Sequence, residues 1–141
     1  MSTDVIARPM TIDETRSTMR RYLDSGHADL EIMSPDVCFT VMATGQEFRG
    51  PGAIAAMLGY FYTQAFEAQA INERVVFGEG RAVGEWDFVG RHIGEFAGVP
   101  ATGKDVNVPL AVAYDLEDGK VVRGRVYFET PAFLAQVGAL G

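Results

Sequence analysis

Apolar positions along the chain follow two different periods. In the first part they recur at helical spacing, as Ile12, Met19, Tyr22 and Leu23 do, and such a stripe marks the buried face of a helix. From residue 70 onward, apolar and polar positions alternate between glycine-bearing turns, a pattern typical of strands. The sequence therefore predicts helices near 11–26, 28–33, 52–66 and 131–138, and strands near 37–43, 70–78, 81–96, 104–116 and 120–129.

Capping and turn residues support the boundaries of these helices. Thr11 and Glu14 have the spacing of a capping box, and Gly26 is suited to end the helix that follows them. Pro51 fits the first turn of a helix, and Ser34-Pro35-Asp36 indicates a turn before the first strand. These signals place the first helix between residues 11 and 26 and a later one after residue 51.

The last four predicted strands follow one another through glycine-bearing connections, which predicts an antiparallel meander. Helices that precede a long meander are typical of an α+β fold with the helices on one face of the sheet. Long, twisted strands curl such a sheet around an apolar pocket. We expect a single domain over residues 1–141, of which residues 1–10 lack periodicity and form a loose arm.

The charge balance narrows the range of functions. The 141 residues include 12 Lys and Arg against 19 Asp and Glu, a formal net charge of −7. Such a surface repels nucleic-acid phosphates and anionic lipid headgroups, so we expect no nucleic-acid and no membrane partner. Cys38 is the single cysteine, which excludes an internal disulfide. From the sequence we expect no signal peptide, no membrane-spanning segment and a cytoplasmic protein.

Four stretches resemble motifs of one protein family, in the order in which that family has them. They are FRGPGAI at 48–54, GRHIGEFAGVPATGK at 90–104, DGKV at 118–121 and FLAQVG at 133–138. Over about residues 11–138 the chain thereby resembles the SnoaL-like polyketide cyclases, which belong to the nuclear transport factor 2-like and ketosteroid isomerase-like superfamily. Each motif alone is weak, whereas four in sequence are more specific.

This resemblance implies a cone-shaped α+β barrel, in which a curved antiparallel sheet and three N-terminal helices enclose a pocket, commonly in dimers. It also implies an aldol-type ring closure that uses no cofactor and no metal. The family's acidic residue on the last strand and its histidine on the strand before are replaced here by Val126 and Val112. Tyr22 matches the tyrosine of the ketosteroid isomerases, whose two acidic positions fall near Val41 and Ala111. Neither known active site is therefore intact.

Alternation along the strands separates a pocket face from an outer face. Glu85 and Asp87 fall on the outer face of the strand near 81–96. We interpret them as partners of Arg91, Arg123 and Arg125 in cross-strand ion pairs, and the alternative is a pair of acid/base carboxylates. The same outer face is where we expect a homodimer contact.

Two protic side chains are the candidate catalytic residues. His92 lies on the apolar face beside the glycine-rich hairpin, and an imidazole is suited to proton transfer at neutral pH; the alternative is a histidine that orders the hairpin. Tyr22 has a hydroxyl that can point into the pocket while its ring packs. His27 is expected in a surface loop, and two distant histidines with one cysteine form no metal site. The candidate ligand-binding residues are Trp86, Phe61, Met57, Phe88, Tyr114, Val112 and Val126.

The leading hypothesis is a SnoaL-like, cofactor-independent cyclase or isomerase that enolises a small hydrophobic carbonyl compound, polyketide-like or steroid-like. In it, His92 acts as acid/base and Tyr22 as hydroxyl donor. The first rival is a non-catalytic dimer that binds a small apolar ligand, which the loss of the inward acidic groups favours. The second rival is an epoxide hydrolase or dehydratase of the same superfamily, which requires a carboxylate in the pocket.

Overall fold

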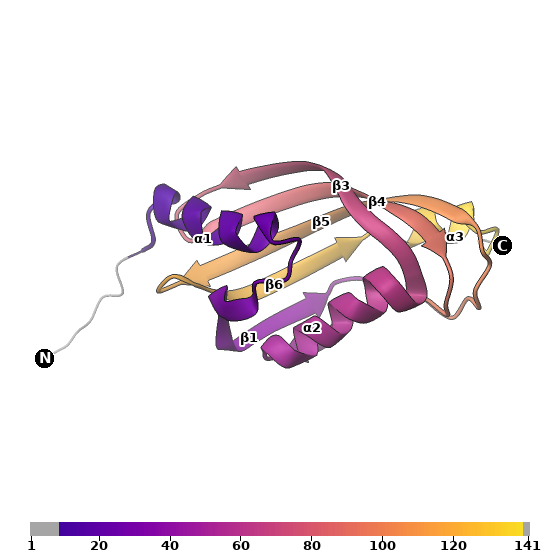
Figure 1. Cartoon of the computed structure of the whole chain (residues 1–141), viewed down its shortest axis with the longest axis horizontal. Coiled ribbons are helices and arrows are strands. Elements are labelled where there is room, and N and C mark those ends of the chain that lie inside the picture. The colour runs from indigo at the N-terminus through magenta and orange to yellow at the C-terminus, as the bar shows by residue number, and fades with distance from the viewer. Residues whose placement is uncertain (1–8, 140–141) are drawn as a thin grey trace, which may run out of the picture.

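The computed structural model describes residues 9–139, which form three α-helices and a six-stranded sheet (Figure 1). A 3₁₀ turn precedes the first strand, and a π-helical segment continues the second α-helix. In chain order the elements are α1 (Ile12–Asp24), the 3₁₀ turn (Leu30–Ile32), β1 (Met33–Val41), β2 (Gln46–Arg49), α2 (Pro51–Gly59), the π-helical segment (Tyr60–Ala65), β3 (Phe66–Phe77), β4 (Arg81–His92), β5 (Asp105–Glu117), β6 (Lys120–Phe128) and α3 (Thr130–Gln136).

The N-terminal capping box forms as the sequence predicts. The Thr11 hydroxyl accepts the backbone N–H of Glu14, and the Glu14 carboxylate accepts that of Thr11. Of the expected loose arm, residues 1–8 lie outside the described residues, whereas Met10 is buried in the core. The first helix is therefore fixed at its start by its own cap and by packing just before it.

The strand order in the sheet is β2-β1-β6-β5-β4-β3. The predicted meander is confirmed, because β3, β4, β5 and β6 pair antiparallel with their neighbours. However, β1 runs parallel to β6, with Phe39 opposite Gly124, so the sheet is mixed and the prediction of a wholly antiparallel sheet is wrong. A parallel neighbour requires a long crossover connection, and the chain between β1 and β6 supplies it. The hairpin signals are local and carry no information on this pairing.

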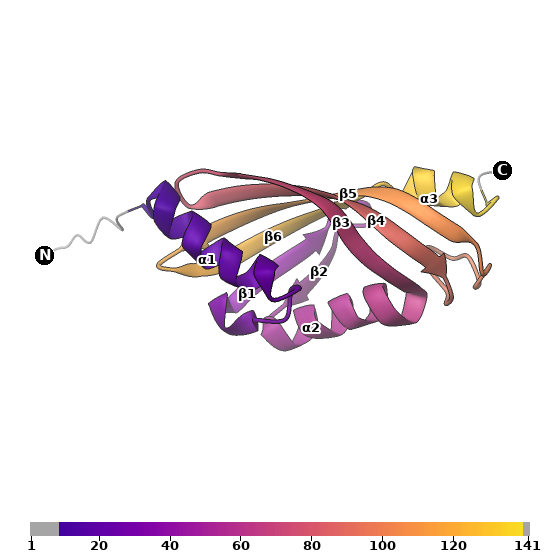
Figure 2. The same ribbon diagram turned by 45° about the horizontal axis from the view of Figure 1, so that its top comes forward.

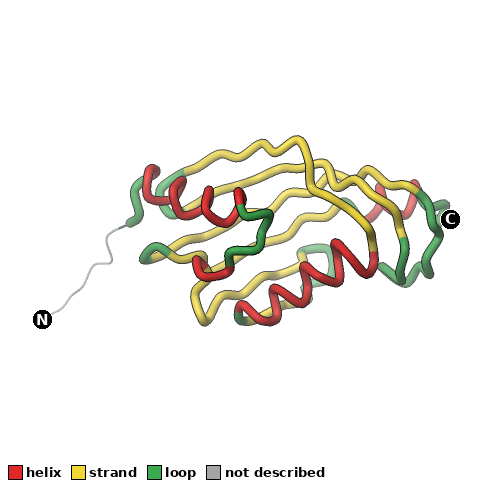
Figure 3. The backbone as a smooth tube through the Cα atoms, in the orientation of Figure 1, coloured by secondary structure: helices red, strands yellow, loops and turns green. Residues whose placement is uncertain are grey.

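The α+β class is confirmed, but the prediction of three N-terminal helices is wrong. Only α1 precedes the sheet, the segment predicted as a second helix is the 3₁₀ turn, α2 lies between β2 and β3, and α3 follows β6. α1 and α2 lie along one face of the sheet, while α3 lies at its far end (Figures 2 and 3). The cone shape that the resemblance implies stays a prediction.

Strands β1 and β2 also differ from the sequence prediction. Pro35, predicted in a turn, lies inside β1, where the register with β6 shifts between Met33 and Cys38; a bulge is the place where a strand tolerates proline. The four-residue strand β2 pairs only with β1 and was not predicted. Within residues 9–139, no helix combines the length and hydropathy needed to cross a membrane.

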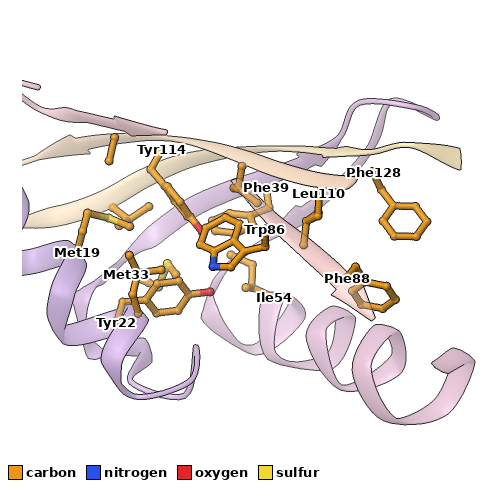
Figure 4. Packing of buried hydrophobic residues seen from close by; sticks show 14 of the residues in the cluster. Met19, Tyr22, Met33, Phe39, Ile54, Trp86, Phe88, Leu110, Tyr114 and Phe128 are labelled. Atoms are coloured by element: carbon orange, nitrogen blue, oxygen red, sulfur yellow. The ribbon is translucent and has the colours of Figure 1, made fainter. Parts of the chain in front are cut away.

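Burial along β4 and β5 alternates residue by residue, as the sequence predicts. The buried positions of both strands face the helices, and their side chains form the core together with Met19 of α1 and Ile54 of α2 (Figure 4). Apolar burial on this face is the main contribution to the stability of the fold. It also sets the walls of the site described next.

Candidate functional site

The core between the helices and the sheet contains a cavity of about 920 Å³. Cavities of about 300–1,000 Å³ with mainly apolar walls are typical of small-molecule sites. Phe88, one of the seven predicted ligand-binding residues, is absent from the lining and instead packs behind Phe61, with ring centroids 4.4 Å apart. The other six line the cavity, and their contact with a ligand stays a prediction: Trp86, Phe61, Met57, Tyr114, Val112 and Val126.

The cavity has a buried end and an open end. At the buried end, Tyr22, Trp86 and Tyr114 are each at most 3% exposed. At the open end, Tyr60 and Glu95 are exposed, and the Tyr60 hydroxyl donates a hydrogen bond to the backbone carbonyl of Glu95. A ligand in this cavity would therefore have aromatic rings around its inner part and polar groups beside its outer part.

Tyr22 and Tyr114 approach each other across the buried end, from α1 and β5 respectively (Figure 4). Their ring centroids are 6.2 Å apart and their planes are nearly perpendicular, at 75°. Neither hydroxyl makes a hydrogen bond to any residue among 9–139. Burial raises the pKa of both phenols. Both hydroxyls therefore stay protonated at neutral pH and are available to donate a hydrogen bond to a ligand.

The position of Trp86 depends on a glycine. Gly84 is two residues away on the same face of β4, and a Cβ atom at Gly84 would lie only 2.2 Å from Cη2 of Trp86. The indole ring consequently occupies the space above Gly84 and forms part of the cavity wall. Glycine in a strand interior often marks such a close approach.

His27 lies in the surface loop after α1, as predicted, but its side chain is half-buried and lines the cavity. Gly26 and His27 have φ of +68° and +66°, and these two left-handed residues turn the chain sharply after α1. The imidazole centroid lies 5.0 Å from the ring of Tyr22 and 5.9 Å from that of Trp86. Burial lowers the pKa of His27. In the sequence, the glycine directly before His27 indicates a turn at the end of the helix, but it does not reveal which way the histidine ring points.

His92, the predicted catalytic histidine, is fully buried at the end of β4 and is not among the residues that line the cavity. Its Nδ1 lies 2.9 Å from the Thr102 hydroxyl and accepts the Thr102 backbone N–H at 3.3 Å. The ring is perpendicular to that of Phe133 on α3, with centroids 5.0 Å apart, and Nε2 has no hydrogen-bond partner within 9–139. These contacts join the β4–β5 hairpin to α3 and support the hairpin-ordering alternative. A catalytic role for His92 stays a prediction.

The carboxylates that the sequence singled out lie away from the cavity. Glu85 is 3.5 Å from Arg74, and Asp87 accepts a hydrogen bond from Asn72, so their partners are on β3 and not the predicted arginines. Among the described residues that line the cavity, Glu95 at the open end is the only Asp or Glu. No group of three or more potential metal ligands occurs within residues 9–139.

The chain is similar to known proteins in sequence family and in fold. The model of the SnoaL-like polyketide cyclase family matches residues 16–137. A protein from Jannaschia Sp. CCS1, proposed to be a SnoaL-like polyketide cyclase, aligns at 21% identity and a TM-score of 0.77, covering 100% of this chain and 99% of that one. TsrD from Streptomyces laurentii aligns at 22% identity and a TM-score of 0.73, covering 91% and 97%.

A phenazine biosynthesis-related protein from Pseudomonas aeruginosa aligns at 20% identity and a TM-score of 0.72, covering 92% of this chain and 83% of that one. None of the curated proteins compared with this chain matches it. At such identities the likeness to the solved structures shows the fold alone, and the chemistry has to be argued from the cavity.

Proposed function

Because this chain belongs to the SnoaL-like polyketide cyclase family, we propose that it is a cofactor-independent cyclase or isomerase. Its substrate is a small hydrophobic carbonyl compound, polyketide-like or steroid-like, which is enolised inside the cavity. A cone-shaped closure of the sheet around that cavity is part of the same proposal. The apolar walls and the volume of about 920 Å³ support a substrate of this kind.

One observation carries the proposal: protonated phenols and an imidazole with a lowered pKa meet at the buried end of an aromatic cavity. Enolisation needs a hydrogen-bond donor at the carbonyl oxygen, where negative charge develops, and a base beside the adjacent carbon. Tyr22 is the proposed donor, since its hydroxyl is protonated and unpaired within the described residues. The base must also lie on the cavity wall, a position that His92 does not hold.

The test measures exchange of α-hydrogen for deuterium in 2-tetralone, a bicyclic ketone, by mass spectrometry in D₂O. We expect the wild-type protein to accelerate exchange over buffer and Tyr22→Phe to lose about 10²–10³-fold of that acceleration, the typical effect of one donor at a developing oxyanion. The matched control is Tyr127→Phe, which removes a hydroxyl from an exposed residue outside the cavity lining. Wild-type exchange no faster than buffer would refute enolisation, and an unchanged rate in Tyr22→Phe would refute the donor role.

The non-catalytic rival has one observation in its favour, the absence of a carboxylate at the buried end of the cavity among the described residues. Native mass spectrometry of the protein purified from its source distinguishes the two. A co-purifying ligand that remains unchanged on incubation supports a binding protein, whereas conversion to a second mass supports an enzyme. An epoxide hydrolase or dehydratase would need a carboxylate there, and Glu85 and Asp87 do not line the cavity.

We also propose that the protein is a homodimer through the outer sheet face. Val76, Val83 and Ile71 on this face are 68%, 39% and 39% exposed, and such apolar side chains are those that a second subunit would cover. A two-fold interface places the same apolar patch on both subunits. Sedimentation velocity should give a dimer for the wild type and a monomer for Val83→Glu. A wild-type monomer at micromolar concentration would refute the assembly.

A further inference from the structure

The loop after α1 holds His27 in a backbone conformation that side chains rarely adopt. Gly26 and His27 both have positive φ, and for a residue other than glycine this conformation is unfavourable. Ser25 fixes the loop, because its hydroxyl donates to the carbonyl of Tyr22 and accepts the backbone N–H of Asp29. Residues held in this way against their conformational preference cluster at functional sites.

Three aromatic rings of the cavity wall surround the imidazole. Tyr22 and Trp86 present their rings at steep angles to it, 76° and 68°, while Tyr62 lies nearly parallel at 17° with centroids 6.3 Å apart. These rings come from α1, β4 and the π-helical segment. Neither ring nitrogen of His27 has a hydrogen-bond partner within residues 9–139, and neither is fully buried. Both nitrogens are thus free to contact a ligand.

The charges around His27 leave it neutral at pH 7. Glu73 on β3 is the carboxylate whose charge acts on the imidazole, and it is 2.8 Å from Arg20. Burial outweighs Glu73 and lowers the pKa of His27 below its ordinary 6.5. The two phenols that face the ring remain uncharged, since burial raises the pKa of Tyr62 to about 12 and that of Tyr22 further. A neutral imidazole is the form that accepts a proton.

We infer that His27 is the general base of the proposed reaction, acting on a planar cyclic ketone that lies against the rings of Trp86 and Tyr62. This inference rests on the proposed function and adds to it the residue that removes the proton. The planes of Tyr62 and Trp86 are inclined at 17° and 68° to the imidazole, so a planar ring system can lie face-on to one of these rings with its edge toward the other.

In the proposed step, the proton moves between the substrate and His27. The unprotonated nitrogen of His27 takes the proton from the α-carbon, the C–H electron pair becomes the enolate double bond, and the carbonyl oxygen gains negative charge beside the Tyr22 hydroxyl. In an isomerisation, His27 returns the proton to another carbon. In a cyclisation, the enolate carbon bonds to a second carbonyl carbon, and His27 protonates the alkoxide that forms.

The test uses His27→Gly, because glycine adopts the positive φ of this position without strain and leaves a vacancy the size of the imidazole. We expect α-exchange of 2-tetralone to fall at least 100-fold, within the range for loss of a general base. Added imidazole should restore part of the rate by occupying the vacancy. Quenching of Trp86, the single tryptophan, should show that 2-tetralone still binds.

The pH profile gives a second measurement on the same protein. The wild-type rate should be constant above about pH 6.5 and fall at lower pH as His27 takes up a proton, whereas the residual rate of His27→Gly should lack this step. His92→Gln represents the competing assignment, and a loss of exchange there with full exchange in His27→Gly overturns the inference. Loss in His27→Gly that imidazole does not restore also overturns it, since packing alone would explain it.

The exchange rates distinguish failure of the proposed function from failure of the His27 assignment. If the wild type exchanges no faster than buffer, the proposed function fails and this inference fails with it. If the wild type exchanges and His27→Gly exchanges within threefold of it, only the assignment of His27 fails. A drop that imidazole reverses, with binding of 2-tetralone retained, supports the inference.

Discussion

Replacing Gly84 with alanine tests whether the indole of Trp86 forms the cavity wall as described. A Cβ atom at Gly84 would lie 2.2, 2.7 and 2.9 Å from three carbon atoms of the Trp86 ring, well inside van der Waals contact. Trp86 is 3% exposed, so its ring is confined on most sides. The ring must therefore move toward the cavity, which is the adjacent open space.

The expected destabilisation follows from this overlap. Adding one methyl group to a well-packed core costs about 1–3 kcal/mol, and the upper part of that range applies because the overlap is severe. Urea unfolding followed by Trp86 fluorescence measures the free energy of unfolding, and the emission maximum of the folded protein reports the ring's surroundings. We expect Gly84→Ala to lower the free energy of unfolding by about 2–3 kcal/mol, to shift the emission and to weaken binding of 2-tetralone.

The matched control is Gly59→Ala in α2. Gly59 has φ of −60° and ψ of −46°, and a Cβ atom there meets nothing within 4 Å, so the change should stabilise the protein by about 0.5–1 kcal/mol through helix propensity. An unchanged stability and emission in Gly84→Ala would refute the described packing of the indole. Destabilisation by both variants would show that the effect is not specific to the Trp86 contact.

Three further outcomes are expected. Asp115→Asn should lower stability at pH 7 by about 1 kcal/mol, because two hydrogen bonds from Arg125 lower the pKa of Asp115. This stabilisation is present above the unfolded pKa of about 3.9 and is lost as pH falls through the folded value, so the difference in urea unfolding between variant and wild type should be smaller at pH 2.5 than at pH 7, and an equal difference at both pH values contradicts the prediction. Gln136→Ala should lower stability by about 1 kcal/mol, since its amide donates to and accepts from the backbone of Asn107; thermal unfolding checks this, and an unchanged Tm contradicts it. Val126→Trp should fill part of the cavity and weaken 2-tetralone binding at least tenfold in calorimetry, and unchanged affinity would place the ligand elsewhere.

Local sequence signals predicted those parts of the fold that local physics determines. The capping box at Thr11 and Glu14 forms from residues three apart, and the alternation along β4 and β5 reports burial on one face directly. The pairing of Phe39 with Gly124 depends on strands far apart in the chain, for which periodicity has no signal. A Cβ atom at Gly124 would lie 2.6 Å from the Phe39 ring, so glycine in this strand permits the close approach of the two strands.

The sequence predicted residues of the cavity wall better than it predicted which histidine lies at the cavity. Trp86 and Tyr22 line the cavity because each lies on the apolar face of a regular element, and such a face can be derived from spacing. His27 was missed because a left-handed loop and not a repeating pattern aims its ring. His92 does lie on the predicted face, but position on a face does not distinguish a cavity wall from the packed layer behind it.

The strand order has a consequence for how the molecule folds. Because β1 is hydrogen-bonded to β6, the wall that contains Phe39 cannot be completed until residues 120–128 are available to pair. Contacts of such long sequence separation slow the search for the native state. We therefore expect the β3–β6 meander to organise first during synthesis and β1 with β2 to join last, so that the ligand cavity is among the final features to form.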